Sequence, residues 1–229
     1  MKKYLHYFLL PLLFIYSISF SQGLNSIATA DGVTVIAVGD NGNILRSSNG
    51  GTTWSKNTVP GYNFKSVAAY DSTVWVSTGN GKVFRSKPGN TPVTILNVNA
   101  NSLNSICAID NLTAWTCGNN GEVYRTTNYG ANWELRNSGI SFPAKLNSIS
   151  FKDALNGIVV GDEGYVYMTN NGGTTWTLTS VPTTRNLLKT KYFATGICIV
   201  GEYGITLMKS GAGSFASVNM RIQTDVRGV

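Results

Sequence analysis

Histidine is almost missing from this 229-residue chain: its one copy, His6, lies in the N-terminal segment 1–21. We predict that this segment is a signal peptide and is removed, so that the mature protein carries no histidine. Ser-His-Asp sites, Cys-His pairs and histidine metal ligands are thereby excluded. We therefore expect no metal centre and no cofactor.

Charge is also scarce. Only 13% of the residues are charged and no run of Lys or Arg occurs, although the formal net charge is +7. Domains that bind nucleic acid carry clustered basic patches, so we expect no nucleic-acid partner. The low charge, together with 25 glycines and an aromatic content of 11%, favours strands and turns over helices.

Cysteine numbers only three, Cys107, Cys117 and Cys198, and no Cys-x-x-Cys spacing is present. Cys107 and Cys117 flank a predicted hairpin turn near Leu112, and an exported protein can form disulfides. A disulfide between these two is one interpretation. Small buried cysteines in strands are the commoner arrangement, so both interpretations stay open.

The longest apolar run is N-terminal. Lys2 and Lys3 precede a run that reaches Phe20, and the small residues Ser19 and Ser21 are those that signal peptidase reads before a cleavage at residue 22. A membrane anchor is the alternative, but the run is shorter than the roughly 20 residues that a spanning helix needs. We expect a secreted or periplasmic protein with no stable membrane insertion after cleavage.

Residues 22–229 repeat one unit about every 40 residues. Each unit opens with Leu-Asn-Ser-Ile or a variant of it, and the openings begin at Leu24, Phe64, Leu103, Leu146 and Leu187. Repeats of about 40–45 residues with several strands are typical of propeller blades. We therefore predict an all-β propeller of four-stranded blades, with five blades at about 24–63, 64–102, 103–145, 146–186 and 187–225.

Within the first unit we predict strands over 25–30, 33–38 and 43–47, and a fourth that begins near Trp54. The second strand is apolar on both faces, which indicates that neighbouring sheets cover both. The last residues, 226–229, look like the start of a further strand. Either five blades close a ring, or the chain is a truncated part of a larger propeller, which is the interpretation we favour.

A turn motif recurs in the first, third and fourth units, and the second and fifth units lack it. Its first copy holds Ser47, Asn49, Gly51, Thr53 and Trp54, and the equivalent residues of the other copies are Asn128, Gly130, Trp133, Asn171, Gly173, Thr175 and Trp176. Asn can bond to backbone amides downstream, and Gly adopts the positive φ that other residues resist. Trp is expected to fill the gap between neighbouring sheets. We interpret the motif as structural.

Only 11 acidic residues occur, and most of them fall in turns. Two sets each share one position of the repeat, Asp31, Asp71, Asp110 and Asp153 in the first and Asp40, Asp162 and Glu202 in the second. Asp at such turns forms local backbone hydrogen bonds. The second set could meet at one mouth of the ring, but the repeat explains both sets without catalysis. We predict no catalytic residue and no enzymatic activity.

Arg46, Arg85 and Arg125 occupy one equivalent position in the first three units. Equivalent positions on successive blades follow an arc, where guanidinium groups could bind carboxylates of a partner protein or an acidic glycan. The alternative, which we favour, is that the arginines are solvated edge residues or that their stems cover aromatic neighbours. These three residues are nevertheless the candidate partner-binding set.

The motif Ser-x-Asn-x-Gly-x-Thr-Trp at 47–54 resembles the Asp-box or BNR repeat, with Asn in place of the usual Asp. Together with the segment 38–46, the unit is similar to the propeller family of the photosystem II assembly and stability factor. That resemblance implies a non-catalytic platform for protein binding or assembly, whose partner is another protein in the cell envelope or outside the cell. The seven-bladed ring usual in that family would need about two more blades.

Asp-box turns are also found in sialidases, so a glycan-binding or sialidase-like glycoside hydrolase propeller is the alternative. A sialidase would need an arginine triad and a Phe/Tyr-Arg-Ile-Pro segment near the N-terminus. The nearest match to that segment, Phe84-Arg85-Ser86-Lys87, lies in the second unit. The enzymatic version is therefore disfavoured, while a glycan remains an alternative partner.

Overall fold

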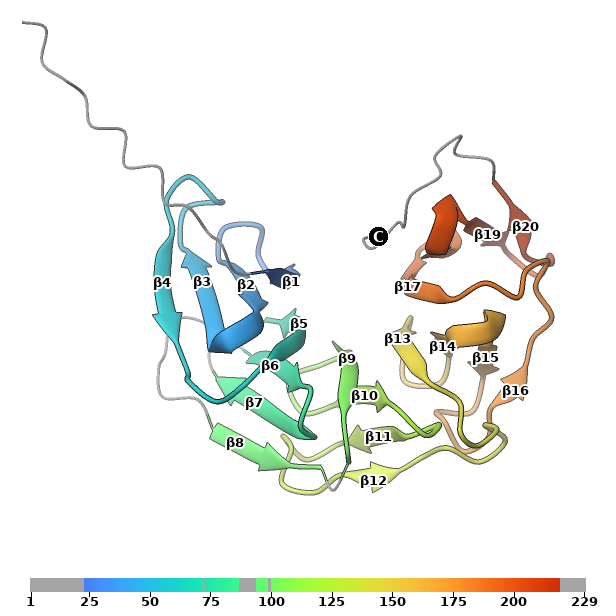
Figure 1. Ribbon diagram of the computed structural model, residues 1–229, viewed down its shortest axis with the longest axis horizontal. Coiled ribbons are helices and arrows are strands. Elements are labelled where there is room, and N and C mark those ends of the chain that lie inside the picture. Colours follow the sequence, from blue (N-terminus) through green and yellow to red (C-terminus); the bar gives the residue numbers. More distant parts are fainter. Residues whose placement is uncertain (1–22, 72, 87–93, 99, 219–229) are drawn as a thin grey trace, which may run out of the picture.

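The computed structural model describes residues 23–71, 73–86, 94–98 and 100–218. They form five antiparallel sheets of four strands each, and each sheet uses four strands that are consecutive in the chain. We call these sheets blades 1 to 5 in chain order. Figure 1 shows the blades side by side around a hub, with the first strand of each blade innermost and the fourth outermost. The predicted all-β propeller of four-stranded blades is confirmed.

The strands of each blade are short and end at turns rich in Gly, Asn and Asp. Blades 1 and 2 comprise β1 (Leu24–Thr29), β2 (Val35–Gly39), β3 (Asn43–Ser47), β4 (Ser55–Thr58), β5 (Phe64–Tyr70), β6 (Thr73–Thr78), β7 (Lys82–Ser86) and β8 (Thr94–Asn97). Blades 3 to 5 comprise β9 (Leu103–Ala108), β10 (Ala114–Gly118), β11 (Val123–Thr126), β12 (Glu134–Leu135), β13 (Leu146–Phe151), β14 (Gly157–Gly161), β15 (Val166–Thr169), β16 (Thr177–Leu178), β17 (Leu187–Phe193), β18 (Gly196–Gly201), β19 (Thr206–Ser210) and β20 (Ala216–Ser217).

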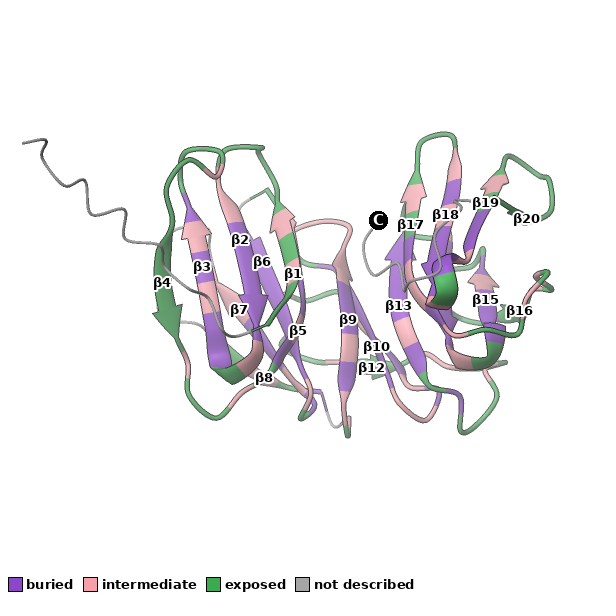
Figure 2. Cartoon of the chain, turned by 45° about the horizontal axis from the view of Figure 1, so that its top comes forward, coloured by how far each residue is buried: buried purple, intermediate pink, exposed green. Residues whose placement is uncertain are grey.

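The core consists of four apolar layers, one between each pair of neighbouring blades. Every residue of β6, β10 and β14 is buried, as the purple second strands of Figure 2 show. These strands consist of apolar and small hydroxyl residues without a charged one, because sheets cover both of their faces. The layer between blades 3 and 4 is the one with the largest aromatic cluster, in which Trp115 stacks on Phe151 with ring centroids 4.1 Å apart.

The turn between the second and third strands is a short 3-10 helix in three blades, at Asp40–Gly42, Asp162–Gly164 and Glu202–Gly204. Its geometry depends on glycine at the last position. Gly42 has φ +73°, and a Cβ there would lie 1.8 Å from the carbonyl oxygen of Val59. The glycine that ends this turn is therefore required both by its conformation and by the close approach of the next segment.

Side chains of the innermost strands tie each blade to the next. Asn25, Asn104 and Asn147 donate to the carbonyl oxygen of the first residue in the following blade's inner strand, at 2.8, 2.8 and 2.9 Å. Serine hydroxyls one position later accept amides of the following strand, as Ser26 does from Val67 at 3.1 Å. These bonds fix the position of each inner strand relative to the inner strand of the next blade.

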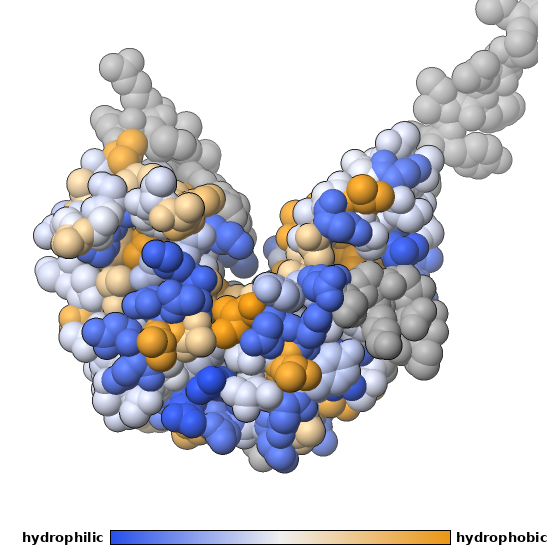
Figure 3. Space-filling view, turned by 180° about the vertical axis from the view of Figure 1, so that it is seen from behind, coloured by the Kyte–Doolittle hydropathy of each residue, from blue (hydrophilic) through white to orange (hydrophobic). Residues whose placement is uncertain are grey.

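The described blades form an open arc, because blade 1 and blade 5 stand apart (Figure 1). Ile27 of β1 is 63% exposed, whereas the equivalent Val67 of β5 is 6% exposed. Leu24 is likewise 45% exposed, while Phe64 at its position in blade 2 is buried. From behind, the opening is a deep notch with apolar side chains at its base (Figure 3). Of the two predicted alternatives, closure of a ring by these five blades is thus not observed.

Three further expectations concern the chain ends and the cysteines. The segments 1–21 and 226–229 lie outside the described residues, so the predicted signal peptide and extra strand stay predictions. The candidate disulfide is wrong: Cys107 and Cys117 are free thiols. The reason is strand register, which places Cys107 opposite Trp115 and Cys117 opposite Ser105. In the segments that the structure describes, no helix is long and apolar enough to cross a membrane.

Candidate binding site at the propeller hub

The predicted turn motif closes on its own side chains. In blade 1, the Ser47 hydroxyl donates to Asn49 Oδ1 at 2.9 Å and accepts the amide of Gly51 at 2.8 Å. Asn49 Oδ1 accepts the amide of Thr53, and Asn49 Nδ2 donates to the Thr53 hydroxyl, both at 2.9 Å. The motif is therefore a locally satisfied turn that presents no free polar group of these residues for chemistry.

The copy in blade 4 has the same bonds. Thr169 takes the place of Ser47, and its hydroxyl accepts the amide of Gly173 at 3.0 Å. Asn171 Oδ1 accepts the amide of Thr175, and its Nδ2 donates to the Thr175 hydroxyl. In blade 3, the hydroxyl of Thr126 and the carboxamide of Asn128 bond to the amides of Gly130 and Asn132 in the same way.

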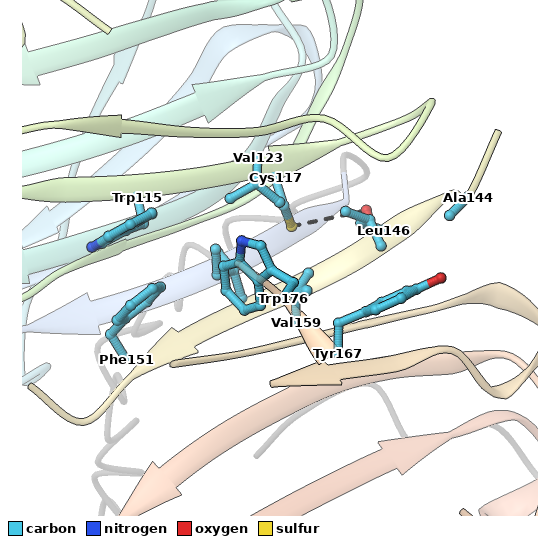
Figure 4. Close-up of a cluster of buried hydrophobic side chains, with 10 residues drawn as sticks. Trp115, Cys117, Val123, Ala144, Leu146, Phe151, Val159, Tyr167 and Trp176 are labelled. Atoms are coloured by element: carbon cyan, nitrogen blue, oxygen red, sulfur yellow. Dashed lines mark hydrogen bonds between the residues drawn. The ribbon is translucent and has the colours of Figure 1, made fainter. Parts of the chain in front are cut away.

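The tryptophans of the motif do not share one environment. Trp176 is 3% exposed, and its indole Nε1 donates across the blade boundary to the carbonyl of Arg136 at 2.8 Å. Figure 4 shows it with Trp115 and Phe151 in the layer between blades 3 and 4. Trp133 packs against Trp75 of blade 2 in a T-shaped contact. The prediction that Trp fills a gap between sheets holds for these two.

For Trp54 that prediction is wrong. This side chain is 39% exposed, and its indole Nε1 bonds to the carbonyl of Gly51 in its own turn. The reason is its place in the arc. Each motif packs against the blade before it, and among the described residues blade 1 has no preceding blade.

Two of the candidate arginines lie over aromatic rings. The guanidinium carbon of Arg85 is 3.6 Å from the centroid of the Tyr129 ring and 6.0 Å from that of Trp75. Arg125 lies over Trp115 at 5.2 Å. Such cation–π contacts use the faces of both partners. The cross-strand neighbour of Arg46 is Ile36, whereas the equivalent neighbours of Arg85 and Arg125 are tryptophans. Arg46 therefore has no aromatic ring at this position.

Arg46, Arg85 and Arg125 are all half-buried, and Arg85 contacts a ring of the next blade. Arg125 also lies directly opposite Glu134 in the pairing of β11 with β12. The stacking favours our alternative interpretation, in which the arginines cover aromatic neighbours. Their role in partner binding stays a prediction.

The acidic residues of the first set stabilise turns. Asp31 accepts the amides of Val33 and Thr34 at 2.9 and 2.6 Å. Hydrogen bonds from these amides, that of Thr34 above all, hold the pKa of Asp31 below its usual value. The Asn156 side chain, with backbone amides, does the same for the pKa of Asp153. Asp110 accepts two amides in the same arrangement, and Asp71 accepts from Asn111 at 2.9 Å.

The acids of the second set each bind an asparagine at the hub-side end of a blade. Asn25 donates to Asp40 at 3.0 Å, Asn147 to Asp162 at 2.6 Å and Asn186 to Glu202 at 3.0 Å. Asp162 also forms an ion pair with Lys145 at 3.2 Å. Each carboxylate thus orients an asparagine of its own blade, and in blades 1 and 4 that asparagine is the one that bonds to the next blade.

The structure brings together a cavity that the sequence had not indicated. It lies at the hub and has a volume of about 830 Å³. Inner-strand residues of all five blades line it, and the second strand of blade 1 adds Val35 and Ala37. Most of the lining side chains are small hydroxyl or apolar groups, including Ser66, Ser105 and Ser148. The notch between blades 1 and 5 opens toward the hub (Figure 3).

Among the described residues, the charged side chains that line the hub come from blade 5. They are Lys189 and Lys191 of β17, and no described Asp or Glu lines the cavity. Burial lowers the pKa of Lys189. Burial raises the pKa of Cys107 to about 12, against the effects of a Phe151 backbone bond and the charge of Lys191. Burial also raises the pKa of Cys117, so both thiols stay protonated at neutral pH and supply no negative charge to the hub.

A sequence signal for these lysines did exist. The inner-strand positions of Lys189 and Lys191 hold Ser148 and Ser150 in blade 4, and Ser26 and Ala28 in blade 1. Blades 1 to 4 hold only small residues at these two positions, so a lysine at both of them in blade 5 changes the side chains that line the hub. No group of three or more His, Cys, Asp or Glu capable of holding a metal occurs within the described ranges.

No protein-family model matches the chain, and no curated protein matches its sequence. Solved structures do match its fold. The structure of YCF48 bound to D1 peptide is 17% identical with a TM-score of 0.69, and the match covers 85% of this chain and 66% of that one. YCF48 from Cyanidioschyzon merolae is 19% identical with a TM-score of 0.71, covering 89% of this chain and 74% of that one.

The WD40 β-propeller domain of Doa1 is 10% identical with a TM-score of 0.73, and the match covers 90% of this chain and 71% of that one. All of these identities are low, so the likeness shows the fold alone. This chain has the propeller fold that YCF48 and WD40 domains share, and it spans about two thirds of the length of the first of these structures. The Asp-box character of its turns stays a prediction.

Proposed function

We propose that this chain is an exported, non-catalytic propeller that binds a polypeptide segment of a partner protein at its hub and serves as an assembly platform. The observation that carries this proposal is the cavity of about 830 Å³ lined by all five blades. Concave sites of this size bury most of the surface of a ligand that enters them. The notch between blades 1 and 5 would let a segment of a larger protein enter from the side.

A similar structure supports the choice of a polypeptide. YCF48, which shares the fold at 17% identity, has been solved bound to D1 peptide. That complex illustrates that a propeller of this kind can hold a peptide. Peptide binding by the present chain, and a role in assembly like that of the photosystem II factor family, belong to the proposal.

The non-catalytic part of the proposal rests on how the acidic residues are used. The carboxylates of Asp31, Asp110 and Asp153 accept backbone amides in turns. Those of Asp40, Asp162 and Glu202 orient asparagines. A glycosidase would need two carboxylates directed at one cleft, whereas these groups are committed to the blades. Export, with the partner in the cell envelope or outside the cell, rests on the predicted signal segment 1–21.

Site-specific photocrosslinking in cells tests this function. A photoreactive phenylalanine derivative is placed at Thr29, which is exposed and lines the hub, or at Asn57, which is exposed on the outermost strand of the same blade. We expect an adduct that protease digests from the Thr29 variant of the full-length chain, in the exported fraction, and none from the Asn57 variant. Adducts at Asn57 alone, or at neither position, would contradict the proposal.

The same experiment addresses the glycan alternative. An adduct at Thr29 that resists protease and is removed by glycosidase would replace the polypeptide with a glycan. Retention of the chain in the cytoplasmic fraction with its N-terminal segment uncleaved would contradict export while leaving the hub as the binding site.

A further inference from the structure

The inner strand of blade 5 departs from the repeat in the two positions that face the hub. Ser148 and Ser150 of blade 4 accept the amides of Thr190 and Tyr192 at 3.2 and 3.1 Å, so in blade 4 both positions bond to the next blade. The first position is also a bonding serine in blades 1 and 3, whereas the second position holds Ala28, Ala68 and Cys107 in blades 1 to 3. In blade 5 the same positions are Lys189 and Lys191. A lysine cannot accept an amide. The two residues therefore have a different use from the serines of blade 4.

In the part of the chain that the structure describes, the two ammonium groups have no charged partner. Among the described residues, ion pairs join Arg136 to Glu134 and Lys145 to Asp162, and neither Lys189 nor Lys191 belongs to one. No described acid lines the cavity with them. Lys189 is half-buried, which strengthens its attraction for an anionic ligand, since less water screens it. An incoming carboxylate would also relieve the desolvation that the free ammonium carries.

Across the notch, one edge of β1 is unpaired by any strand that the structure describes. In blades 2, 4 and 5 the amides of Val67, Ile149 and Thr190 are covered by serine hydroxyls of the preceding blade. The equivalent residue of β1 is Ile27, and no described residue supplies a hydroxyl to it. Its side chain is exposed, as is that of Leu24. A free edge beside apolar side chains is the surface to which an extended peptide adds as a strand.

From these observations we infer that the hub receives an extended, acidic segment of a partner protein, whose carboxylates pair with Lys189 and Lys191 and whose backbone follows β1. The inference rests on the proposed function and adds the chemistry of the partner. A polypeptide fits better than an acidic glycan, because only a polypeptide can use both the strand edge and the apolar side chains of β1.

The repeat itself supplies the variant that tests this inference. Lys189→Ser/Lys191→Ser installs in blade 5 the residues that blade 4 carries, so the inner strand keeps a sequence that this fold accepts. The matched control is Lys56→Ser/Lys152→Ser, which removes the same charge from two exposed positions away from the hub lining. Thermal unfolding of both variants verifies that they fold.

The probe is a fluorescein-labelled octapeptide of alternating Glu and Val, which places its acids on one face of a strand. Its binding to the full-length chain is measured by fluorescence anisotropy. We expect the wild type to bind it, and to bind the Gln-Val analogue at least about tenfold more weakly. The hub double variant should lose about tenfold or more in affinity, and the control variant less than about twofold. Raising the salt concentration should weaken the wild-type complex.

Equal affinity for the Glu and Gln peptides, or full binding by the folded hub variant, would overturn the acidic selectivity while leaving a hub crosslink, and thus the proposed function, intact. Binding of an oligogalacturonate without binding of the peptide would overturn the choice of a polypeptide. If the double variant fails to fold, Lys191→Glu alone decides: Lys191 is exposed, and the inference requires this reversal to abolish binding, so that retained binding overturns it.

Discussion

The turns at 47–54 in blade 1 and 169–176 in blade 4 share nearly all of their hydrogen bonds but not their surroundings. In both, a hydroxyl and an asparagine carboxamide bond to the same set of amides. Trp176 is nevertheless buried against blade 3, whereas Trp54 is exposed. The local sequence therefore determines the turn, and the neighbouring blade determines what the turn contributes to the core. Blade 1 has a complete turn without a blade to receive it.

Replacing the tryptophans should separate the two turns most strongly. Trp176→Ala removes a buried side chain and its bond to Arg136, which should cost about 3–5 kcal/mol. Trp54→Ala removes an exposed side chain bonded only within its own turn, and should cost about 1 kcal/mol or less. Urea unfolding followed by circular dichroism measures both. Similar losses would mean that another surface covers Trp54 in solution.

Glycine substitutions give the next largest difference. Gly173 has φ +70°, and a Cβ there would meet a ring carbon of Trp115 at 2.6 Å. Gly173→Ala should therefore cost about 3 kcal/mol, from both the left-handed backbone and overpacking. Gly51 has φ +91° with its nearest neighbour at an ordinary 3.6 Å. Gly51→Ala should cost about 1–2 kcal/mol, from the backbone alone, and a loss as large as at Gly173 would show that blade 1 is packed like blade 4.

Removing the hydroxyl should affect the two turns alike. Ser47→Ala and Thr169→Val each leave the amide of the turn glycine and the asparagine carboxamide without that partner. Both hydroxyls are buried, so each change should cost about 1–2 kcal/mol. The loss is measured as the shift in the midpoint of urea unfolding, provided that the dependence of the unfolding free energy on urea concentration is unchanged. Losses that differ as much as those of the tryptophans would contradict a turn specified by its own residues.

Much of this architecture could be predicted from the repeat. Its period identified the five units, and the predicted third strand at 43–47 is found as β3 (Asn43–Ser47). The second strand was expected at 33–38 but begins at Val35. The reason is that the Asp31 side chain takes the amides of Val33 and Thr34 into the turn. Local propensity favours a strand at these β-branched residues, but the side-chain bond prevails.

The candidate site was harder to predict, because a hub is assembled from residues that are far apart in the chain. The arginines attracted attention by recurring, yet two of them lie over aromatic rings. Lys189 and Lys191 are distinctive because no other blade has lysine at these positions of the repeat. Only the arrangement of the blades places them in one cavity with β1. The exposure of Trp54 also could not be read from its motif, since burial depends on a neighbour rather than on the turn.

The acids that begin the hairpins provide the smallest test of the same comparison. Asp31 in blade 1 and Asp153 in blade 4 both have a lowered pKa, through the backbone amides of Thr34 and Val33 in the first case and through Asn156 and backbone amides in the second. A depressed folded-state pKa adds stability that is fully present above the unfolded value and is lost as the pH falls through the folded value. Below about pH 4 the chain should thus lose part of its stability.

Asp31→Asn and Asp153→Asn should each reduce this loss of stability by a similar small amount, because both turns are exposed and local. Urea midpoints at pH 6 and pH 3 measure it, and a change at Asp153 without one at Asp31 would mean that the missing neighbour weakens even the hairpin turns of blade 1.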